Sequence, residues 1–199
     1  MVMAGAVHAE YILAAWEFSS GTGASYAADG IAASEEFSEN VRQMTVIGKA
    51  LQIGSADGTF GSGADIGKSA DTEVGALNVM GSPNAPLTRT ASFTVTNNGE
   101  KEIKLSHIRF DFLRNNEDSV KDFTVEISGD EVKTKSVLKE NSRKVTAGKA
   151  GDGRRKHDDI DAKLAGYVLP AGGSVTLKMS FKIAGSAWTA VDNIAITGE

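Results

Sequence analysis

Ser174–Ile183 reads SVTLKMSFKI and is the clearest indication of the fold class. Its apolar side chains stand at every second position: Val175, Leu177, Met179, Phe181 and Ile183. Successive side chains of a β-strand point to opposite faces, so this pattern predicts a strand with one buried and one solvated face. Half-buried strands of this kind are typical of antiparallel sheets.

Short apolar segments of the same kind occur along the whole chain. Further strands are predicted at Tyr11–Phe18, Met44–Ile53, Val74–Met80, Arg89–Thr96, Ile103–Leu113, Phe123–Ile127, Leu164–Leu169 and Trp188–Thr197. Ala27–Asn40 is expected to be a loop with a short strand, and a short helix is the alternative. Many short strands without a long helical pattern predict an all-β fold, an antiparallel β-sandwich of the jelly-roll type.

Local signals predict how some of these strands are joined. Asn97–Gly99 is a strong hairpin turn signal, and Ser82-Pro83 predicts a second turn. The apolar alternation changes parity after Leu105, which predicts a β-bulge at Ser106-His107. Thr146–Asp161 is rich in glycine and charged residues, so we expect a loop there.

The amino-acid composition excludes several classes of protein. The chain has 199 residues, no cysteine and a formal net charge of −5. The lack of cysteine excludes disulfides and thiolate chemistry and fits an exported protein, so we expect an extracellular or cell-surface location. The acidic charge argues against nucleic-acid binding. No stretch of about 18 apolar residues occurs, so no transmembrane helix is expected.

The N-terminus differs from the rest of the chain. Residues 1–10 are predicted to be an apolar extension, and residues 11–199 a single β-sandwich domain. Met1–Ala9 (MVMAGAVHA) resembles the end of a signal peptide. It also resembles a donor strand, because one parity is shared by Met1, Met3, Val7, Tyr11 and Leu13. Such a strand could complete the sheet of another copy of the chain.

Several segments together resemble a known family. They are the strand Phe93-Thr94-Val95 with its turn, the strand Ile108–Phe112, the final Val191–Ile196 and the opening Ala15–Phe18. The pattern is similar to exported proteins of Planctomycetes- and Verrucomicrobia-type bacteria, often those with a PEP-CTERM sorting signal. The resemblance implies a jelly-roll sandwich outside the cell. No Pro-Glu-Pro motif, apolar span or basic tail follows the last strand, so anchoring by that route is not expected.

Motifs for catalysis are weak. The histidines His8, His107 and His157 have no helical i, i+4 partner, and no Gly-x-Ser-x-Gly elbow occurs. Ser62–Ser69 (SGADIGKS) nearly matches a phosphate-binding loop, but Ser62 replaces its first glycine and a predicted strand follows it. We therefore expect no enzymatic activity.

Calcium is the one cofactor that the sequence suggests, because oxygen-rich loops suit this cation. The candidate ligands are Asp57, Asp65 and Asp71 in a glycine-rich loop, or Glu17 with Asp192 where the first and last strands are expected to meet.

Two functions fit these features. The first is a non-enzymatic structural protein of the cell surface or of a filament, which associates with copies of itself through strand addition. The alternative is a monomeric carbohydrate-binding or adhesion module whose partner is an extracellular polysaccharide. Its aromatic platform would be Tyr26 and Tyr167, since both tryptophans are expected in the core.

Overall fold

The computed structural model describes residues 9–18, 23–44, 76–114, 122–130, 132–141, 157–164 and 166–199. Within these ranges the secondary structure is entirely β, and no helix that could span a membrane is present. The strands are β1 (Tyr11–Trp16), β2 (Tyr26–Ala27), β3 (Ile31–Phe37), β4 (Val41–Met44), β5 (Ala76–Asn97), β6 (Ile103–Arg114), β7 (Asp122–Gly129), β8 (Lys135–Asn141), β9 (His157–Lys163), β10 (Val168–Leu169) and β11 (Ser174–Gly198).

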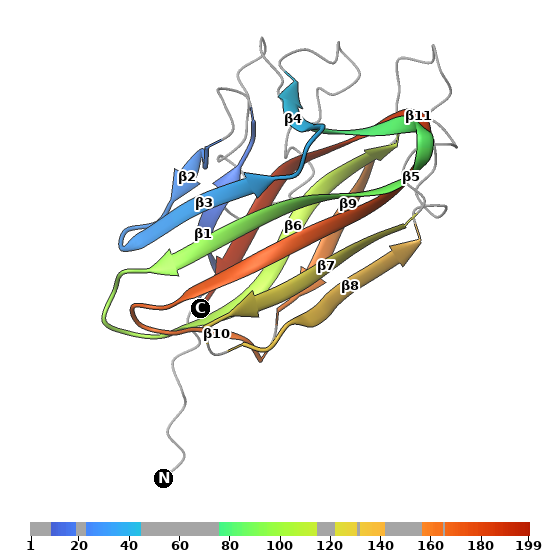
Figure 1. Ribbon diagram of the computed structural model, residues 1–199. Helices are drawn as coiled ribbons and strands as arrows, with labels where there is room; N and C mark the ends of the chain where they lie inside the picture. Colours follow the sequence, from blue (N-terminus) through green and yellow to red (C-terminus); the bar gives the residue numbers. More distant parts are fainter. Residues whose placement is uncertain are drawn as a thin grey trace.

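The strands form two stacked antiparallel sheets that share the long strands β5 and β11 (Figure 1). The front sheet has the order β3-β5-β11-β7-β8 and uses the first half of β11. In the back sheet, the second half of β11 pairs with β6 on one side and with β1 and the start of β5 on the other. The edges of the back sheet are β2 and β4 on one side and β9 and β10 on the other. The predicted jelly-roll β-sandwich is confirmed.

Aromatic side chains fill the space between the sheets. Phe112 stacks on Phe123 with 4.7 Å between ring centroids, and Trp16 packs edge-on against Phe93 at 5.0 Å. The alternating residues of Ser174–Ile183 are buried as predicted. Burial of this apolar surface is the main force that holds the two sheets together.

Strand β5 continues through a segment where the sequence predicted a turn. β5 runs without interruption from Ala76 to Asn97, so the turn predicted at Ser82-Pro83 is wrong. The pairing of β5 with β11 is irregular here, because the register shifts on both sides of Gly185, which pairs with Ser82. Proline and glycine are tolerated where the ladder of hydrogen bonds is interrupted, so the two strands pass together from one sheet to the other.

The predicted hairpin after β5 is also wrong. A turn does occur, and the Asn97 side chain holds it by accepting from the Gly99 N–H at 2.9 Å and donating to the Lys101 carbonyl at 2.7 Å. However, β5 does not pair with β6, because β11 pairs with both of them. The turn therefore carries the chain from the front sheet to the back sheet.

Two edge segments differ from expectation. A loop was expected at Thr146–Asp161, but strand β9 begins within this segment. β9 is an edge strand that pairs with β6 alone, and its apolar residues are Ile160 and Ala162. The strand predicted at Leu164–Leu169 is reduced to β10, because Gly166 turns the chain with φ 91°. In Ala27–Asn40, the short strand is confirmed as β3 and the alternative helix is wrong.

The predicted bulge in β6 is confirmed. Ile108 pairs with Ile196, and Leu105 pairs with Gly198. Between these two pairs the chain advances by three residues on β6 but by only two on β11. The extra residue lies at Ser106-His107 and lets Leu105 and Ile108 both face the core. A one-residue change in register would move these side chains to the other face, so the bulge fixes which residues point outward.

Candidate functional site

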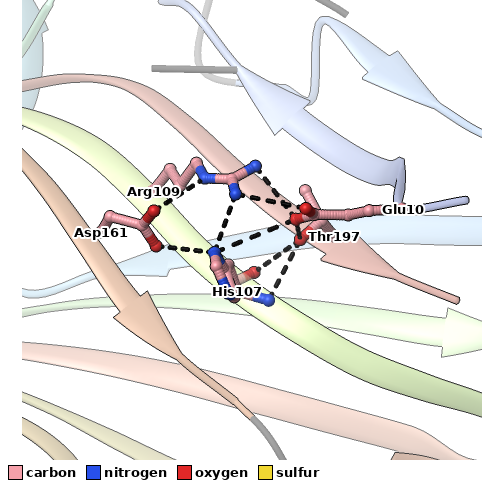
Figure 2. A network of polar contacts seen from close by, with 5 residues as sticks. All are labelled: Glu10, His107, Arg109, Asp161 and Thr197. Carbon is pink, nitrogen blue, oxygen red and sulfur yellow. Dashed lines mark hydrogen bonds and ion pairs between the residues drawn. The ribbon is translucent and has the colours of Figure 1, made fainter. Parts of the chain in front are cut away.

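Five polar side chains gather on the outer face of the back sheet, and we call them the polar network. They are Glu10, His107, Arg109, Asp161 and Thr197 (Figure 2). His107 and Arg109 alternate with the buried Ile108 and Phe110 of β6, so they point away from the core. Asp161 of β9 is the cross-strand partner of Arg109. Thr197 of β11 is opposite the second residue of β1, and Glu10 directly precedes that strand.

Arg109 is the centre of the network. Its Nη1 lies 3.0 Å from Glu10 Oε1, and its Nε donates to Asp161 Oδ2 at 3.3 Å. Its Nη2 also donates to Glu10 Oε2 at 3.3 Å. Figure 2 shows the guanidinium between the two carboxylates. The Arg109 side chain is only 12% exposed, whereas Glu10 is 33% and Asp161 52% exposed. The carboxylates are therefore the groups that the network presents to solvent.

Thr197 ties the two ends of the described chain together. Its hydroxyl donates to the Glu10 carboxylate and accepts from the backbone N–H of His107 at 3.0 Å. Thr197 is buried, so these bonds satisfy a hydroxyl that would otherwise be costly to bury. The network consequently fixes Glu10 against β6 and β11.

The neighbours of Glu10 control its ionisation. Burial by itself raises the pKa of this carboxyl, but the hydrogen bonds from Thr197 and Arg109 and the charges of Arg109 and His107 outweigh it. The pKa of Glu10 is therefore lowered from its ordinary value. A lowered carboxyl pKa stabilises the fold above the pH range where glutamate ordinarily titrates, and this contribution is lost as the pH falls through the folded-state pKa.

We expect Glu10→Gln to lower the free energy of unfolding by about 1 kcal/mol near pH 7 and by much less near pH 3, because glutamine mimics only the protonated form. Urea denaturation at both pH values measures this. Glu36→Gln, on the exposed face of β3, is the control and should not change the midpoint at either pH. An equal loss for Glu10→Gln at both pH values would contradict the assignment.

Glu17 and Asp192 lie where the first and last strands meet, as the sequence predicted. Trp16, which precedes Glu17, is the cross-strand partner of Ile194, and Asp192 stands two residues before Ile194 on β11. Burial raises the pKa of Glu17, and the Asp192 Oδ1 accepts from the Asn193 N–H at 2.8 Å. In the described ranges no three metal-binding side chains cluster.

The other predicted calcium ligands, Asp57, Asp65 and Asp71, lie outside the described residues. Calcium binding therefore stays a prediction.

The two predicted platform tyrosines lie at opposite edges of the back sheet. Tyr26 of β2 is opposite Ala15, which belongs to a small buried cluster with Ile12 and Ala195 on the side of the sheet away from the main core. Tyr26 thus shares the outer face with the polar network and is 36% exposed. Tyr167 precedes β10, and the Lys135 Nζ lies 5.8 Å from its ring centroid. The structure does not bring the two rings together.

The predicted assembly strand is only partly described. Tyr11 and Leu13 belong to β1, which pairs with β11 and β2 of the same chain. Leu13 is fully buried in its own core. Met1, Met3 and Val7 lie outside the described residues, so strand addition by the N-terminal extension stays a prediction.

The network contains a histidine beside a carboxylate and a hydroxyl, groups that also occur together in nucleophilic sites. His107 Nδ1 lies 2.8 Å from Asp161 Oδ1, as in a base oriented by a carboxylate. The hydroxyl of Thr197 contacts His107 through its backbone and donates to Glu10, so it is not aligned with the ring. What the network presents to solvent is two carboxylates, Glu10 and Asp161, held in place by Arg109.

Of these five residues, only His107 is a candidate from the sequence, as one of three histidines without a helical i, i+4 partner. No motif marks Glu10, Asp161 or Thr197. The one available signal was the i, i+2 spacing of His107 and Arg109 in an otherwise apolar alternation, which places two polar side chains together on the outer face of one strand.

Comparisons with known proteins relate the chain to others through its fold. No protein-family model matches the sequence, and no curated protein matches it. The K1 cleaved adhesin domain of Lys-gingipain from Porphyromonas gingivalis W83 superposes with a TM-score of 0.50 at 12% identity, over 95% of this chain and 98% of that one.

The CBM22-1 xylan-binding domain of Xyn10C from Paenibacillus barcinonensis gives a TM-score of 0.50 at 11% identity, over 97% of each chain. The fold is one that these domains share. At this level of identity the likeness extends to the β-sandwich alone.

Proposed function

We propose that this protein is a non-catalytic glycan-binding module that acts outside the cell or at its surface. Its binding face is the outer face of the back sheet. The observation that carries the proposal is the polar network, which holds two partly exposed carboxylates in place around one arginine on the outer side of the back sheet. Tyr26, on the same face, adds an exposed aromatic ring.

These groups match the chemistry of a sugar. Carboxylates accept strong hydrogen bonds from hydroxyl donors, and an aromatic ring packs against the apolar face of a sugar ring. Because Arg109 already fixes Glu10 and Asp161, a ligand would not have to order them, and less conformational entropy is lost on binding.

The spacing of the strands suggests an extended ligand. β2, which carries Tyr26, is separated from β6 by β1 and β11. Three strand spacings amount to about 14 Å. A single sugar could contact Tyr26 or the network but not both, so we favour an oligosaccharide long enough to reach both.

The structural neighbours support the same class of function, since one is described as xylan-binding and the other as an adhesin domain. We favour glycan binding over self-assembly because β1 is already paired on both sides within its own sandwich.

The test compares two matched substitutions. Asp161→Asn removes a carboxylate from the network, and Asp122→Asn removes one from the exposed end of β7 in the front sheet. Wild-type protein is expected to bind a polysaccharide from a panel of soluble xylan, mannan and galactan in affinity electrophoresis. Loss of one charged acceptor should weaken binding about tenfold in Asp161→Asn, and Asp122→Asn should bind like wild type.

Equal weakening in both variants would show that general surface charge is responsible, and would contradict the assignment of the face. Absence of binding to every polysaccharide in the panel would count against the function itself.

A further inference from the structure

Strand β3 forms one edge of the front sheet, as Figure 1 shows. Within the described ranges it pairs with β5 alone, from Ile31 opposite Asn97 to Phe37 opposite Ala91. The register has no shift over these seven residues. An edge strand of this kind is a template on which another strand can pair.

The hydrogen bonds at both ends of β3 show which backbone groups face its free side. The Ser38 N–H donates to the Thr90 carbonyl at 2.9 Å, and the Gly30 carbonyl accepts from the Asn98 N–H at 2.7 Å. In an antiparallel ladder, every second residue turns both of its backbone groups to the partner strand. The even-numbered residues of β3 therefore bond to β5. From Ala33 onward, the odd-numbered residues turn their N–H and C=O groups to the free side.

We propose that β3 pairs with β3 of a second copy of this chain, antiparallel and about a two-fold axis at Ser34. In this register Ala33 lies opposite Glu35 of the partner subunit, and Ile31 lies opposite Phe37 of the partner subunit. All seven residues overlap, and the free backbone groups of each strand bond to those of the other. The two front sheets become one continuous sheet, and β1 stays paired within its own sandwich.

The charges of β3 fit this register. Glu35 lies opposite Ala33 and Glu36 lies opposite Ala32, so like charges do not face each other directly. Glu35 and its copy are diagonal neighbours, but Glu35 Oε2 accepts from Trp16 Nε1 at 3.0 Å within its own sandwich. Moving the axis by one residue would set Glu35 directly against its copy, which disfavours that register.

The apolar residues of β3 fit the same register. Ile31, Ala33 and Phe37 are partly buried and pack against the core of their own sandwich. Pairing about Ser34 brings Ile31 of each copy against Phe37 of the partner subunit. The dimer therefore buries apolar surface that the edge of a single copy leaves partly exposed.

The other edge strands of the described ranges carry features that oppose pairing with a copy. Strands β2 and β10 have two residues each, and β4 has four. Strand β8 begins with Lys135, and its register against β7 shifts. In β9, pairing about Ile160 would set Asp159 against Asp161 of the partner subunit. Short strands, lysines, register shifts and like charges all disfavour pairing at a sheet edge, so β3 is the edge that best suits a second copy.

Sedimentation velocity of the full chain tests the dimer. Wild type is expected to change from about one to about two times its mass of 20.8 kDa as its concentration rises from about 5 µM to about 500 µM. Dissociation on dilution is expected because pairing through one strand buries less than the standard interface of about 1,600 Å².

Substitutions at Ser34 test the position of the axis. Ser34 is exposed, and it lies opposite its own copy in the proposed register. Ser34→Lys and Ser34→Glu should each weaken self-association at least about tenfold, since like charges then face each other. An equimolar mixture of the two variants should recover the dimer, because the facing charges then have opposite signs, and recovery also shows that both variants fold. Ser136→Lys, on the exposed part of β8, is the matched control and should associate like wild type.

Wild type that stays monomeric at the highest concentration would overturn the proposal. A mixture that stays monomeric while wild type dimerises would overturn it too, as would equal weakening by Ser136→Lys. None of these outcomes bears on glycan binding, because β3 belongs to the front sheet and the polar network to the back sheet.

Discussion

Trp16→Ala is expected to lower the free energy of unfolding by about 3–5 kcal/mol. Trp16 is fully buried, and its ring packs edge-on against Phe93 of the opposite sheet at 5.0 Å. Its indole N–H donates to Glu35 Oε2 at 3.0 Å, a further link between the sheets. Truncation would leave a cavity and would also deprive the partly buried Glu35 of its donor. A loss of this size is a large share of the total stability of a typical domain.

Urea denaturation followed by circular dichroism measures the effect. Trp16→Phe keeps an aromatic ring and should lose clearly less, because the cavity is smaller. Tyr11→Ala, which truncates an exposed aromatic of the same strand, should lose less than about 1 kcal/mol. If Trp16→Ala unfolded at the same urea concentration as Tyr11→Ala, the packing of the Trp16 ring between the sheets would be wrong.

Arg109→Met is expected to have the second-largest effect, a loss of about 2 kcal/mol. The substitution keeps the aliphatic part of the side chain but leaves Glu10 and Asp161 without the cation between them. Removing one partner of a fully buried pair costs about 3–5 kcal/mol. We expect less here because both carboxylates are partly solvated and water screens their charge.

A double substitution separates charge from packing. Adding Glu10→Gln to Arg109→Met should recover part of the loss, because it relieves the uncompensated carboxylates. Lys178→Met on β11 is the matched control, since this exposed lysine is opposite Glu126 on the front sheet. It should change stability by less than about 0.5 kcal/mol. Losses that simply add in the double variant would mean that Arg109 and Glu10 are not coupled.

The sequence predicted those parts of the fold that depend on local alternation. Ser174–Ile183 shows its buried face directly, and the change of parity after Leu105 revealed the bulge. It could not show that β11 pairs with both β5 and β6, because pairing between distant strands has no local signature. The turn signal after Asn97 was therefore recognised while its hairpin was not. Strand β9 was not predicted for a different reason. It is a charged edge strand, and an edge strand can form with few apolar residues, so it shows no apolar alternation.

The polar network could not be predicted from the sequence. Glu10 and Thr197 are separated by 187 positions, and only the pairing of the first strand with the last brings them together. Arg109 and Asp161 meet through the pairing of β6 with a segment that resembled a loop. Each residue alone has the appearance of an ordinary solvated polar side chain. Their significance comes from the register of four segments, which the structure supplies.

We assign glycan binding to the outer face of the back sheet. Titration of the isotope-labelled protein with the best-binding oligosaccharide, followed through its backbone amide resonances, tests this most directly. We expect the largest shifts at Tyr26, His107, Arg109 and Asp161, while the outward residues of β5 and β7 in the front sheet are unaffected. Shifts concentrated on the front sheet, with the polar network unchanged at saturation, would contradict it.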